Sequence, residues 1–263
     1  MNMMKTISGV FLTLGLLVGA STAHADKLDT VQSKGVLKVA VPQDFPPFGS
    51  VGTDLQPHGY DIDMAGYLAK QLNVKLELVP VTSANRIPYL QTGKVDLVIS
   101  SMGKNPEREK AIDFTKAYAP FYLGVFGQSS EKVSSPKDLA GKTIGVTRGS
   151  VEDLELSKLA PSDAVIKRFE DNNATLSSYL SGQVSLIATG NLVVTEIATR
   201  FPAKAPETKF LIKNSPCYVG VAKGETALLD KVNTLIDKAK QDGVLEGFSQ
   251  KWLKAPFPKD LGA

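Results

Sequence analysis

Short apolar runs alternate with amphipathic stretches along most of the chain. Val36–Val41 and Thr143–Thr147 have the length and the β-branched content of buried strands. Between such runs, apolar residues recur at helical spacing, as Ile62, Ala65 and Leu68 do. Regular alternation of strands with helices is typical of α/β proteins. We therefore expect an α/β fold with mostly parallel sheets flanked by helices.

The pattern runs through two successive series of elements. Asp61 is expected to cap the first long helix, and Ser150 with Asp153 to form a capping-box-like start to another. The expected strands are 36–41, 75–79, 95–100, 143–147, 164–169, 186–189 and 209–212. The expected helices are 61–72, 85–91, one carrying Arg108, one starting at Ser150, 173–180, 192–200 and an amphipathic tail within 226–253.

Two extended segments interrupt the alternation, near residues 121–126 and 213–219. They are the only candidates for lobe boundaries, because the chain has no repeat, low-complexity tract or long linker. Two crossings imply a discontinuous domain. We expect one lobe from residues 26–122 and 218–263, and a second lobe from residues 123–217.

The first 25 residues predict a secretory signal peptide. Lys5 precedes an apolar stretch from Ile7 to Val18, and Ala23-His24-Ala25 fits a small-residue cleavage site. The apolar stretch is short for a membrane span, although an uncleaved anchor is the alternative. With no cysteine at the cleavage point, a lipid anchor there is not expected. We expect cleavage before Asp26 and a periplasmic destination.

Charge and residue usage then exclude several classes of function. Removal of Lys5 lowers the formal net charge from +3 to +2, which gives no reason to expect nucleic acid or an anionic membrane as partner. Cys217 is the only cysteine, so no internal disulfide is possible, and a buried apolar role is expected for it. After cleavage His58 is the only histidine, so no transition-metal site and no cofactor are expected.

Arg108 is the strongest candidate for ligand binding. Asn105 is expected to cap its helix and Pro106 to be the first helical residue, directly after the 95–100 strand. Backbone N–H groups of such a turn and a planar guanidinium together can bind a carboxylate. The alternative is a surface arginine on a capped helix.

An aromatic loop follows the first strand. In Asp44-Phe45-Pro46-Pro47-Phe48, two prolines stiffen the loop at the carboxyl end of a strand, where ligands of open α/β sheets collect. We expect Phe45 to form an aromatic wall against a small ligand and Phe48 to fill the core. The alternative for both is a core role.

Two further turns also follow strands. Arg86 can reach the same cleft or stay in solvent at its helix start, and neither reading is favoured. Arg148-Gly149-Ser150-Val151 offers N–H groups at a second helix start, which makes a weaker anion site presented from the other lobe. The chain has no nucleophile elbow, no phosphate-binding glycine loop and no Ser/His/Asp set, so an enzyme is not expected.

Together these segments resemble the family 3 extracellular solute-binding proteins, the periplasmic receptors of polar amino-acid ABC importers. The resemblance covers residues 34–255. The motifs that carry it are Phe45-Pro46-Pro47-Phe48, Gly59-Tyr60-Asp61-Ile62-Asp63-Met64-Ala65, Leu90-Gln91-Thr92-Gly93-Lys94-Val95-Asp96-Leu97, Pro106-Glu107-Arg108-Glu109, Asp113-Phe114-Thr115 and Asp138-Leu139-Ala140-Gly141-Lys142-Thr143-Ile144-Gly145-Val146. It implies a periplasmic binding protein fold, in which two hinge strands join the lobes and the cleft closes on a ligand.

The resemblance also implies roles for site residues. Arg108 would bind the ligand α-carboxylate and Phe45 would stack on the ligand. Arg86 would contact the ligand side chain. Backbone groups would assist from both lobes, namely those of Ser101, Gly103, Ser150 and Val151.

Three positions depart from the family pattern. Gly103 replaces a residue that commonly donates a hydroxyl, and Ser83 replaces a hydrophobic wall. Gly190, with Asn191 beside it, replaces the aspartate that pairs the ligand ammonium. A buried ammonium without a carboxylate is costly. Either another acid serves, with Asp44 the first candidate, or the ligand lacks an ordinary α-ammonium; Asn191 can still accept a hydrogen bond.

These observations predict a receptor rather than an enzyme. Its ligand would be a small carboxylate-bearing solute, an amino acid or a derivative, delivered to the membrane permease of an ABC importer by cleft closure. We expect a monomer. The alternative is a periplasmic enzyme on the same scaffold, a cyclohexadienyl-type dehydratase, although Gly190 removes the natural position for its general acid.

Overall fold

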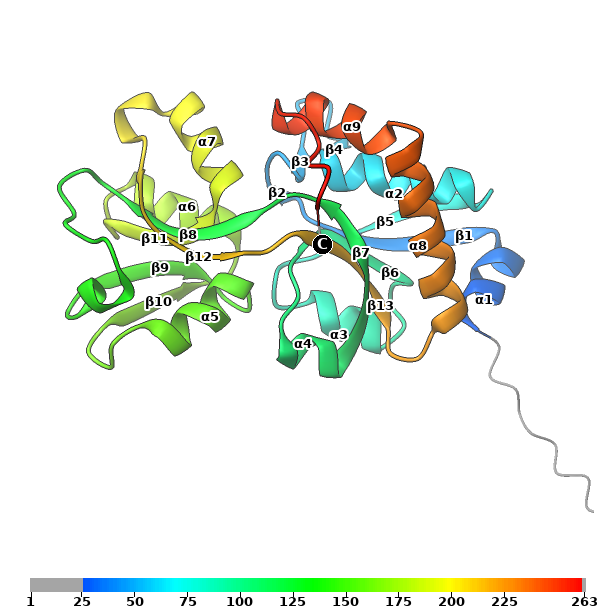
Figure 1. The fold of residues 1–263 in the computed structure, drawn as a ribbon, viewed down its shortest axis with the longest axis horizontal. Coiled ribbons are helices and arrows are strands. Elements are labelled where there is room, and N and C mark those ends of the chain that lie inside the picture. Colours follow the sequence, from blue (N-terminus) through cyan, green and yellow to red (C-terminus); the bar gives the residue numbers. More distant parts are fainter. Residues whose placement is uncertain (1–25, 262–263) are drawn as a thin grey trace, which may run out of the picture.

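The computed structural model describes residues 26–261, so the expected signal peptide lies outside the described residues. Two five-stranded sheets, each flanked by helices, form two lobes joined by extended strands (Figure 1). We call the part built on the sheet of β1 (Val36–Val41) lobe 1, and the part built on the sheet of β9 (Thr143–Thr147) lobe 2. The expected two-lobed α/β fold is confirmed.

The sheet of lobe 1 has the strand order β5-β1-β6-β13-β7. β1 pairs in parallel with β5 and β6, whereas β13 pairs antiparallel with β6 and β7. These strands are β5 (Lys75–Pro80), β6 (Leu97–Met102), β7 (Ile112–Ala119) and β13 (Cys217–Ala222). The flanking helices are α1 (Lys27–Lys34), α2 (Tyr60–Gln71), α3 (Arg86–Gln91), α4 (Pro106–Ala111), α8 (Thr226–Gln241) and α9 (Val244–Phe248), followed by a π-helix at Ser249–Leu253. A three-stranded sheet holds β2 (Asp44–Phe45), β3 (Gly49–Val51) and β4 (Pro57–His58).

The sheet of lobe 2 repeats this plan with the order β10-β9-β11-β8-β12. β9 pairs in parallel with β10 and β11, whereas β8 pairs antiparallel with β11 and β12. Its other strands are β8 (Tyr122–Gly127), β10 (Val165–Phe169), β11 (Leu186–Gly190) and β12 (Glu207–Asn214). Its helices are α5 (Val151–Leu159), α6 (Asn172–Leu180) and α7 (Asn191–Arg200), with 3-10 turns at Pro136–Leu139 and Pro202–Lys204.

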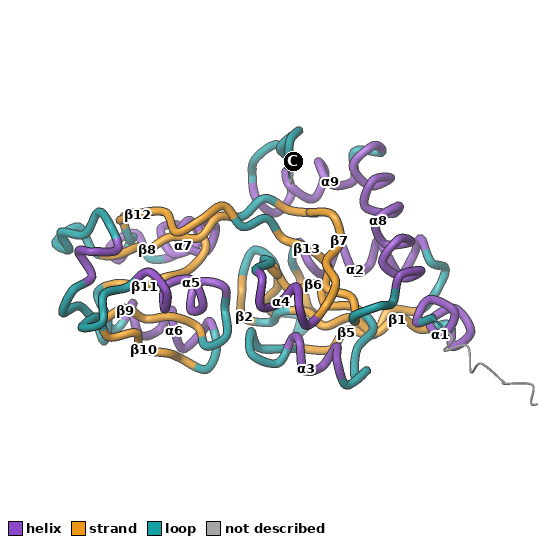
Figure 2. Tube along the Cα trace, turned by 60° about the horizontal axis from the view of Figure 1, so that its bottom comes forward, coloured by secondary structure: helices purple, strands orange, loops and turns teal. Residues whose placement is uncertain are grey.

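The chain passes between the lobes twice, from β7 to β8 and from β12 to β13, and the two passages run side by side in both views (Figures 1 and 2). The Ser215 N–H donates to the Phe121 carbonyl where they cross, over 2.9 Å. Every antiparallel pair of the two large sheets contains either β8 or β13. Four of the five strands in each sheet therefore run in the same direction, as expected of mostly parallel sheets, and only β13 in lobe 1 and β8 in lobe 2 are reversed.

Most expected elements lie within one or two residues of their predicted bounds, and one helix start differs. α2 begins at Tyr60 after Gly59, so Asp61 is its second residue rather than its cap. Asp61 is fully buried, and its carboxylate accepts hydrogen bonds from the Ser101 N–H (2.7 Å) and the Tyr118 hydroxyl. The prediction failed because an acidic residue at a helix start can also serve a tertiary contact.

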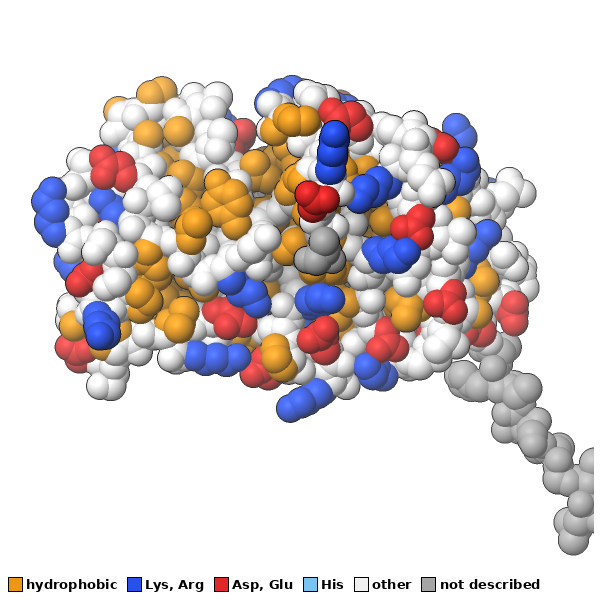
Figure 3. Space-filling model, viewed as in Figure 1, with side chains coloured by type: hydrophobic (Ala, Val, Ile, Leu, Met, Phe, Trp, Pro, Cys, Tyr) orange, Lys and Arg blue, Asp and Glu red, His pale blue; other side chains and the backbone are white. Residues whose placement is uncertain are grey.

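The core forms where each sheet meets its helices. Phe48 and Cys217 are fully buried, as expected, in a hydrophobic cluster that extends from lobe 1 into lobe 2. Acidic and basic side chains are interspersed over the face in Figure 3, in keeping with the small net charge. No helix within residues 26–261 is long and apolar enough to cross a bilayer. The same residues contain no cluster of three or more His, Cys, Asp or Glu suited to a metal ion.

Candidate functional site

A cavity lies between the two lobes, with about 450 Å³ of empty space that includes the open solvent at its mouth. Strand ends and helix starts of both lobes line it, as is usual for binding sites of open α/β folds. Seven of the ten residues predicted from the sequence line it: Asp44, Phe45, Arg86, Ser101, Gly103, Ser150 and Val151. The other lining residues are Pro42, Val81, Ser83, Ser100, Phe121, Leu123, Glu152, Asn172 and Ser215.

Phe45 forms the aromatic side of the cavity. It is buried and packs against Phe48 in a stacked arrangement and against the edge of Phe121, with ring centroids 6.0 and 5.9 Å away. Such packing fixes the ring orientation before any ligand arrives.

Asp44, beside Phe45, joins the two lobes. Its carboxylate accepts hydrogen bonds from the Asn172 backbone N–H (2.7 Å) and the Asn172 side-chain amide (3.1 Å) at the start of α6. A carboxylate at a helix N-terminus is also favoured by the helix dipole. Asp44 therefore contributes to holding the lobes together, in addition to lining the cavity.

Arg86 belongs to the cavity and not to the solvent. Its buried guanidinium donates to the carbonyl oxygens of Ser100 (2.7 Å) and Ser83 (3.2 Å). Burial lowers the pKa of Arg86, and the negative charges of Glu152, Asp61 and Asp44 oppose that shift. Two of its five N–H donors are used in this way, which leaves others for an anion.

Arg108 lies between the lobes but does not line the cavity. Asn105 caps α4 as expected, since its Oδ1 accepts from the Arg108 N–H (2.9 Å). The guanidinium is 4% exposed and donates to the carbonyls of Gly103 in lobe 1 (2.7 Å) and Gly149 in lobe 2 (2.8 Å). Burial, together with the charge of Arg86, lowers its pKa to about 9, so it stays protonated at neutral pH.

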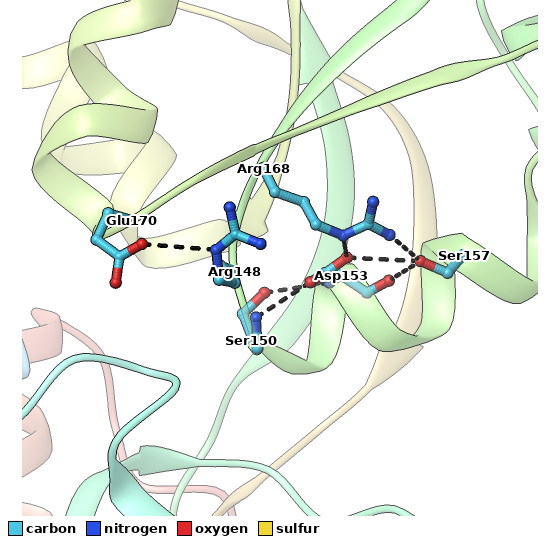
Figure 4. A network of polar contacts seen from close by, with 7 residues as sticks. Arg148, Ser150, Asp153, Ser157, Arg168 and Glu170 are labelled. Carbon is cyan, nitrogen blue, oxygen red and sulfur yellow. Dashed lines mark hydrogen bonds and ion pairs between the residues drawn. The ribbon is translucent and has the colours of Figure 1, made fainter.

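Ser150 and Val151 bring the start of α5 to the cavity. The Ser150 hydroxyl accepts from the Asp153 N–H (3.1 Å), as the capping prediction requires. The Asp153 carboxylate accepts from the Gly149 N–H (3.1 Å) and pairs with Arg168 (2.8 Å; Figure 4). The positive φ of Gly149 lets this turn approach the opposite lobe closely.

Two predicted residues point elsewhere. Arg148 is exposed and pairs with Glu170 over 3.5 Å, away from the cavity (Figure 4). β9 ends at the buried Thr147, and the next side chain, that of Arg148, faces the opposite way into solvent. The Asn191 Oδ1 accepts from the Tyr122 N–H (3.1 Å) and thereby tethers β8 to α7 instead of lining the cavity.

Glu152 is the main residue that the sequence reasoning missed. It is buried in the first turn of α5 and lines the cavity. Burial raises the pKa of Glu152, while the positive charges of Arg86 and Arg108 oppose that shift. The sequence did carry one signal for Glu152, because it lies two residues after the predicted helix start at Ser150.

Phe121 occupies the space beside Gly190. A Cβ on Gly190 would lie only 1.8 Å from the Phe121 Cζ atom, well inside van der Waals contact. A side chain at position 190 is therefore incompatible with this ring position, and the ammonium-pairing aspartate of the family pattern has no room. The cavity carboxylates come instead from Asp44 and Glu152.

Comparison with known proteins gives a consistent result. Residues 37–255 match the bacterial extracellular solute-binding proteins, family 3. The ABC transporter glutamine-binding protein GlnH of Bacillus subtilis is 28% identical over 200 residues, which cover 74% of this chain and 72% of GlnH. The cysteine-binding protein of Campylobacter jejuni is 26% identical with a TM-score of 0.82, over 89% of this chain and 96% of that one. The ancestral amino acid-binding protein AncCDT-1, described as a precursor of cyclohexadienyl dehydratase, is 32% identical with a TM-score of 0.77, over 87% and 99%.

Proposed function

Because the chain belongs to the bacterial extracellular solute-binding proteins of family 3, we propose that it binds a small carboxylate-bearing solute between its lobes. The solute is an amino acid or an amino-acid derivative, in keeping with the glutamine and cysteine named for two relatives. The bound form is delivered to the membrane permease of an ABC importer.

The observation that carries this proposal is the buried Arg86 in a cavity between the lobes. A guanidinium held by backbone carbonyls on one side presents its remaining donors to a carboxylate on the other. The N–H groups at the start of α5 face the same space from lobe 2. An anion that contacts both lobes therefore favours the closed arrangement.

Arg108 serves closure in this proposal. Its bond to Gly149 forms only when the lobes meet, whereas its bond to Gly103 lies within lobe 1, and its charge adds to the positive potential around the cavity. Ligand binding and lobe closure thus stabilise one another. Arg148 and Asn191, although expected at the ligand, have no direct contact with it in this proposal.

An amino group on the ligand would be paired by Asp44 or Glu152. Asp44 was the first candidate from the sequence, and its carboxylate already accepts two hydrogen bonds from Asn172. Glu152 lies in the same cavity and is not the acceptor of those bonds. A ligand without an α-ammonium can still bind Arg86 through its carboxylate, so the ligand panel includes both kinds of solute.

We place the protein in the periplasm, as a monomer whose signal peptide is cleaved before Asp26. The charge and apolar pattern of residues 1–25 supports export, and the membership in an extracellular family agrees with it. Mass spectrometry of the protein recovered from the periplasmic fraction would test the cleavage position, and a chain still starting at Met1 would contradict it.

The function is tested by thermal unfolding in the presence of the twenty L-amino acids, L-cystine, glutarate and 2-oxoglutarate. A ligand at 100 times its Kd stabilises the folded state by about 2.7 kcal/mol, so a true ligand gives a clear rise in Tm. Calorimetry then provides its Kd. If none of these compounds raises the Tm, the proposed ligand class is wrong.

A second candidate function follows from Glu152. A buried acid in a cavity with a raised pKa has the properties of a general acid, and AncCDT-1 is described as a precursor of an enzyme. Incubation with prephenate or arogenate, followed by ultraviolet absorbance, tests for dehydratase activity. We expect no turnover, because the relatives are binding proteins.

A further inference from the structure

Ser215 has a buried hydroxyl that no other group in the described residues satisfies. The residue is 3% exposed, its Oγ has no hydrogen-bond partner within residues 26–261, and it lines the cavity between the lobes. Its backbone is fixed by the N–H bond to the Phe121 carbonyl, at the crossing from β12 to β13. Buried hydroxyls in native proteins nearly always have a partner, so this one requires an explanation.

Gly103 provides the space for this hydroxyl. A Cβ built on Gly103 would lie 2.2 Å from the Ser215 Oγ but 3.5 Å from the Ser215 Cβ. The only overlap below 3 Å involves the hydroxyl; the Val151 Cγ2 atom at 3.3 Å would have to shift slightly, and the rest of Ser215 would be in ordinary contact. Gly103 cannot move aside, because its carbonyl accepts from the buried Arg108 guanidinium. A side chain at 103 and a hydroxyl at 215 compete for one position.

The surroundings of this position favour an anion. The Arg86 guanidinium and the start of α5 line the same cavity and supply N–H donors, whereas the Ser101 N–H already donates to Asp61. A hydroxyl has one proton to donate, and an oxygen of a carboxylate is the strongest acceptor such a ligand can offer.

We propose that the Ser215 hydroxyl is a direct ligand contact that donates to a carboxylate oxygen of the bound solute, and that Gly103 is required because it leaves room for it. This inference rests on the proposed function. It makes the crossing segment part of the binding site, so the ligand touches both lobes and the connection between them. Specificity then depends on a residue outside the loops that follow the parallel strands.

The test uses Ser215→Ala, Gly103→Ser and the double variant Gly103→Ser/Ser215→Ala, with the exposed Ser130→Ala in a lobe 2 turn as matched control. Each protein is titrated calorimetrically with the panel of L-amino acids, L-cystine, glutarate and 2-oxoglutarate. We expect Ser215→Ala to weaken the tightest wild-type interaction by about tenfold, the size of one hydrogen bond to a charged group. Ser130→Ala should bind as the wild type does.

The double variant transfers the hydroxyl from position 215 to position 103, on the opposite side of the space between these two residues. Gly103→Ser alone should lose affinity through the overlap, whereas the double variant should recover to within about threefold of wild type because the Ser215→Ala change removes that overlap. Without added compound, the Tm of Ser215→Ala should be unchanged or higher, since no internal bond is lost. A residue with only a structural role would lower the Tm and leave the Kd unchanged.

The outcomes separate the two proposals. If the wild type binds a panel member and Ser215→Ala binds it within twofold, the ligand contact is refuted while the receptor function stands. A double variant no tighter than Ser215→Ala alone refutes the role of Gly103. If the wild type binds no member of the panel, the proposed function fails, and the inference is overturned with it.

Discussion

The Arg108 guanidinium in lobe 1 donates to the Gly149 carbonyl in lobe 2 over 2.8 Å. The same guanidinium donates to the Gly103 carbonyl in its own lobe, so one buried side chain ties two backbone segments together. Gly149 contributes a turn whose positive φ lets its carbonyl reach across the cleft. Arg108 therefore joins the two lobes, while a different cation, Arg86, lines the cavity between them.

Replacement of Arg108 by Ala should weaken ligand binding by about 2–5 kcal/mol, measured by calorimetry with the tightest ligand from the panel. The loss arises because the interlobe bond to Gly149 disappears and the carbonyls of Gly103 and Gly149 both lose their donor. Arg148→Ala is the matched control, because that side chain is exposed and pairs with Glu170. An Arg108→Ala protein that binds as tightly as Arg148→Ala would rule out the assigned role.

Gly190 should not tolerate a side chain while Phe121 is present. Gly190→Ala is expected to lower the free energy of unfolding by about 1–3 kcal/mol, the usual cost of overpacking, because its Cβ would overlap the Phe121 ring. In a Phe121→Leu background the destabilisation by Gly190→Ala should be smaller. Denaturant unfolding of the wild type, the two single variants and the double variant gives the coupling free energy between the two positions. Gly66→Ala in α2, where a Cβ meets nothing, serves as control and should not destabilise. Additive effects would contradict the overlap.

Asp44 should control closure as well as binding. Asp44→Ala removes the acceptor of both Asn172 hydrogen bonds across the cleft, so affinity should fall by about ten- to a hundredfold. The radius of gyration of the ligand-free protein, measured by small-angle scattering, should increase as the lobes separate. Asp54→Ala, in the exposed turn before β4, should change neither quantity. An unchanged radius with reduced affinity would indicate a ligand contact without a closure role.

Asp61 should make stability depend on pH. Burial raises its pKa to about 7 from 3.8, while hydrogen bonds from Tyr118 and Ser101 oppose the shift. Between pH 4 and pH 7 the folded protein holds a proton that the unfolded chain has released, so this group favours folding less as pH rises. Relative to Asp61→Asn, the wild-type free energy of unfolding should fall with a slope approaching about 1.4 kcal/mol per pH unit in that window.

Denaturant unfolding at several pH values measures this slope. Asp29→Asn, on an exposed position of α1, shows the effect of removing a carboxylate that is not buried. If the curves of wild type and Asp61→Asn run parallel from pH 4 to pH 7, the Asp61 carboxyl is ionised throughout in the folded state. The expected sign of the dependence would then be wrong.

Features set by local chemistry were predictable from the sequence. The bounds of β1 follow from a six-residue run with five apolar residues, and Asn105 caps α4 because its side chain accepts an N–H three residues on. Seven cavity residues were found because strand ends and helix starts converge in α/β folds. Arg86, which the sequence left undecided, is buried there.

Features that depend on how the lobes meet were not predictable. The bond from Arg108 to Gly149 and the filling of the Gly190 position by Phe121 join segments far apart in the chain. Ser215 lies in a crossing segment that carries no motif. The prediction for Arg148 failed for a local reason instead. A shift of one residue at the end of a strand turns the side chain to the opposite face of the sheet.

The position of β13 has a consequence for how the chain acquires its structure. β13 separates β6 from β7 in the sheet of lobe 1, yet more than a hundred residues of sequence lie between Met102 and Cys217. All strands of the lobe 2 sheet lie within that interval. As the chain is synthesised from its N-terminus, all strands of the lobe 2 sheet are available before β13, which completes the lobe 1 sheet. Non-local pairing of this kind forms slowly, so we expect the docking of β13 to be a late step in the folding of lobe 1.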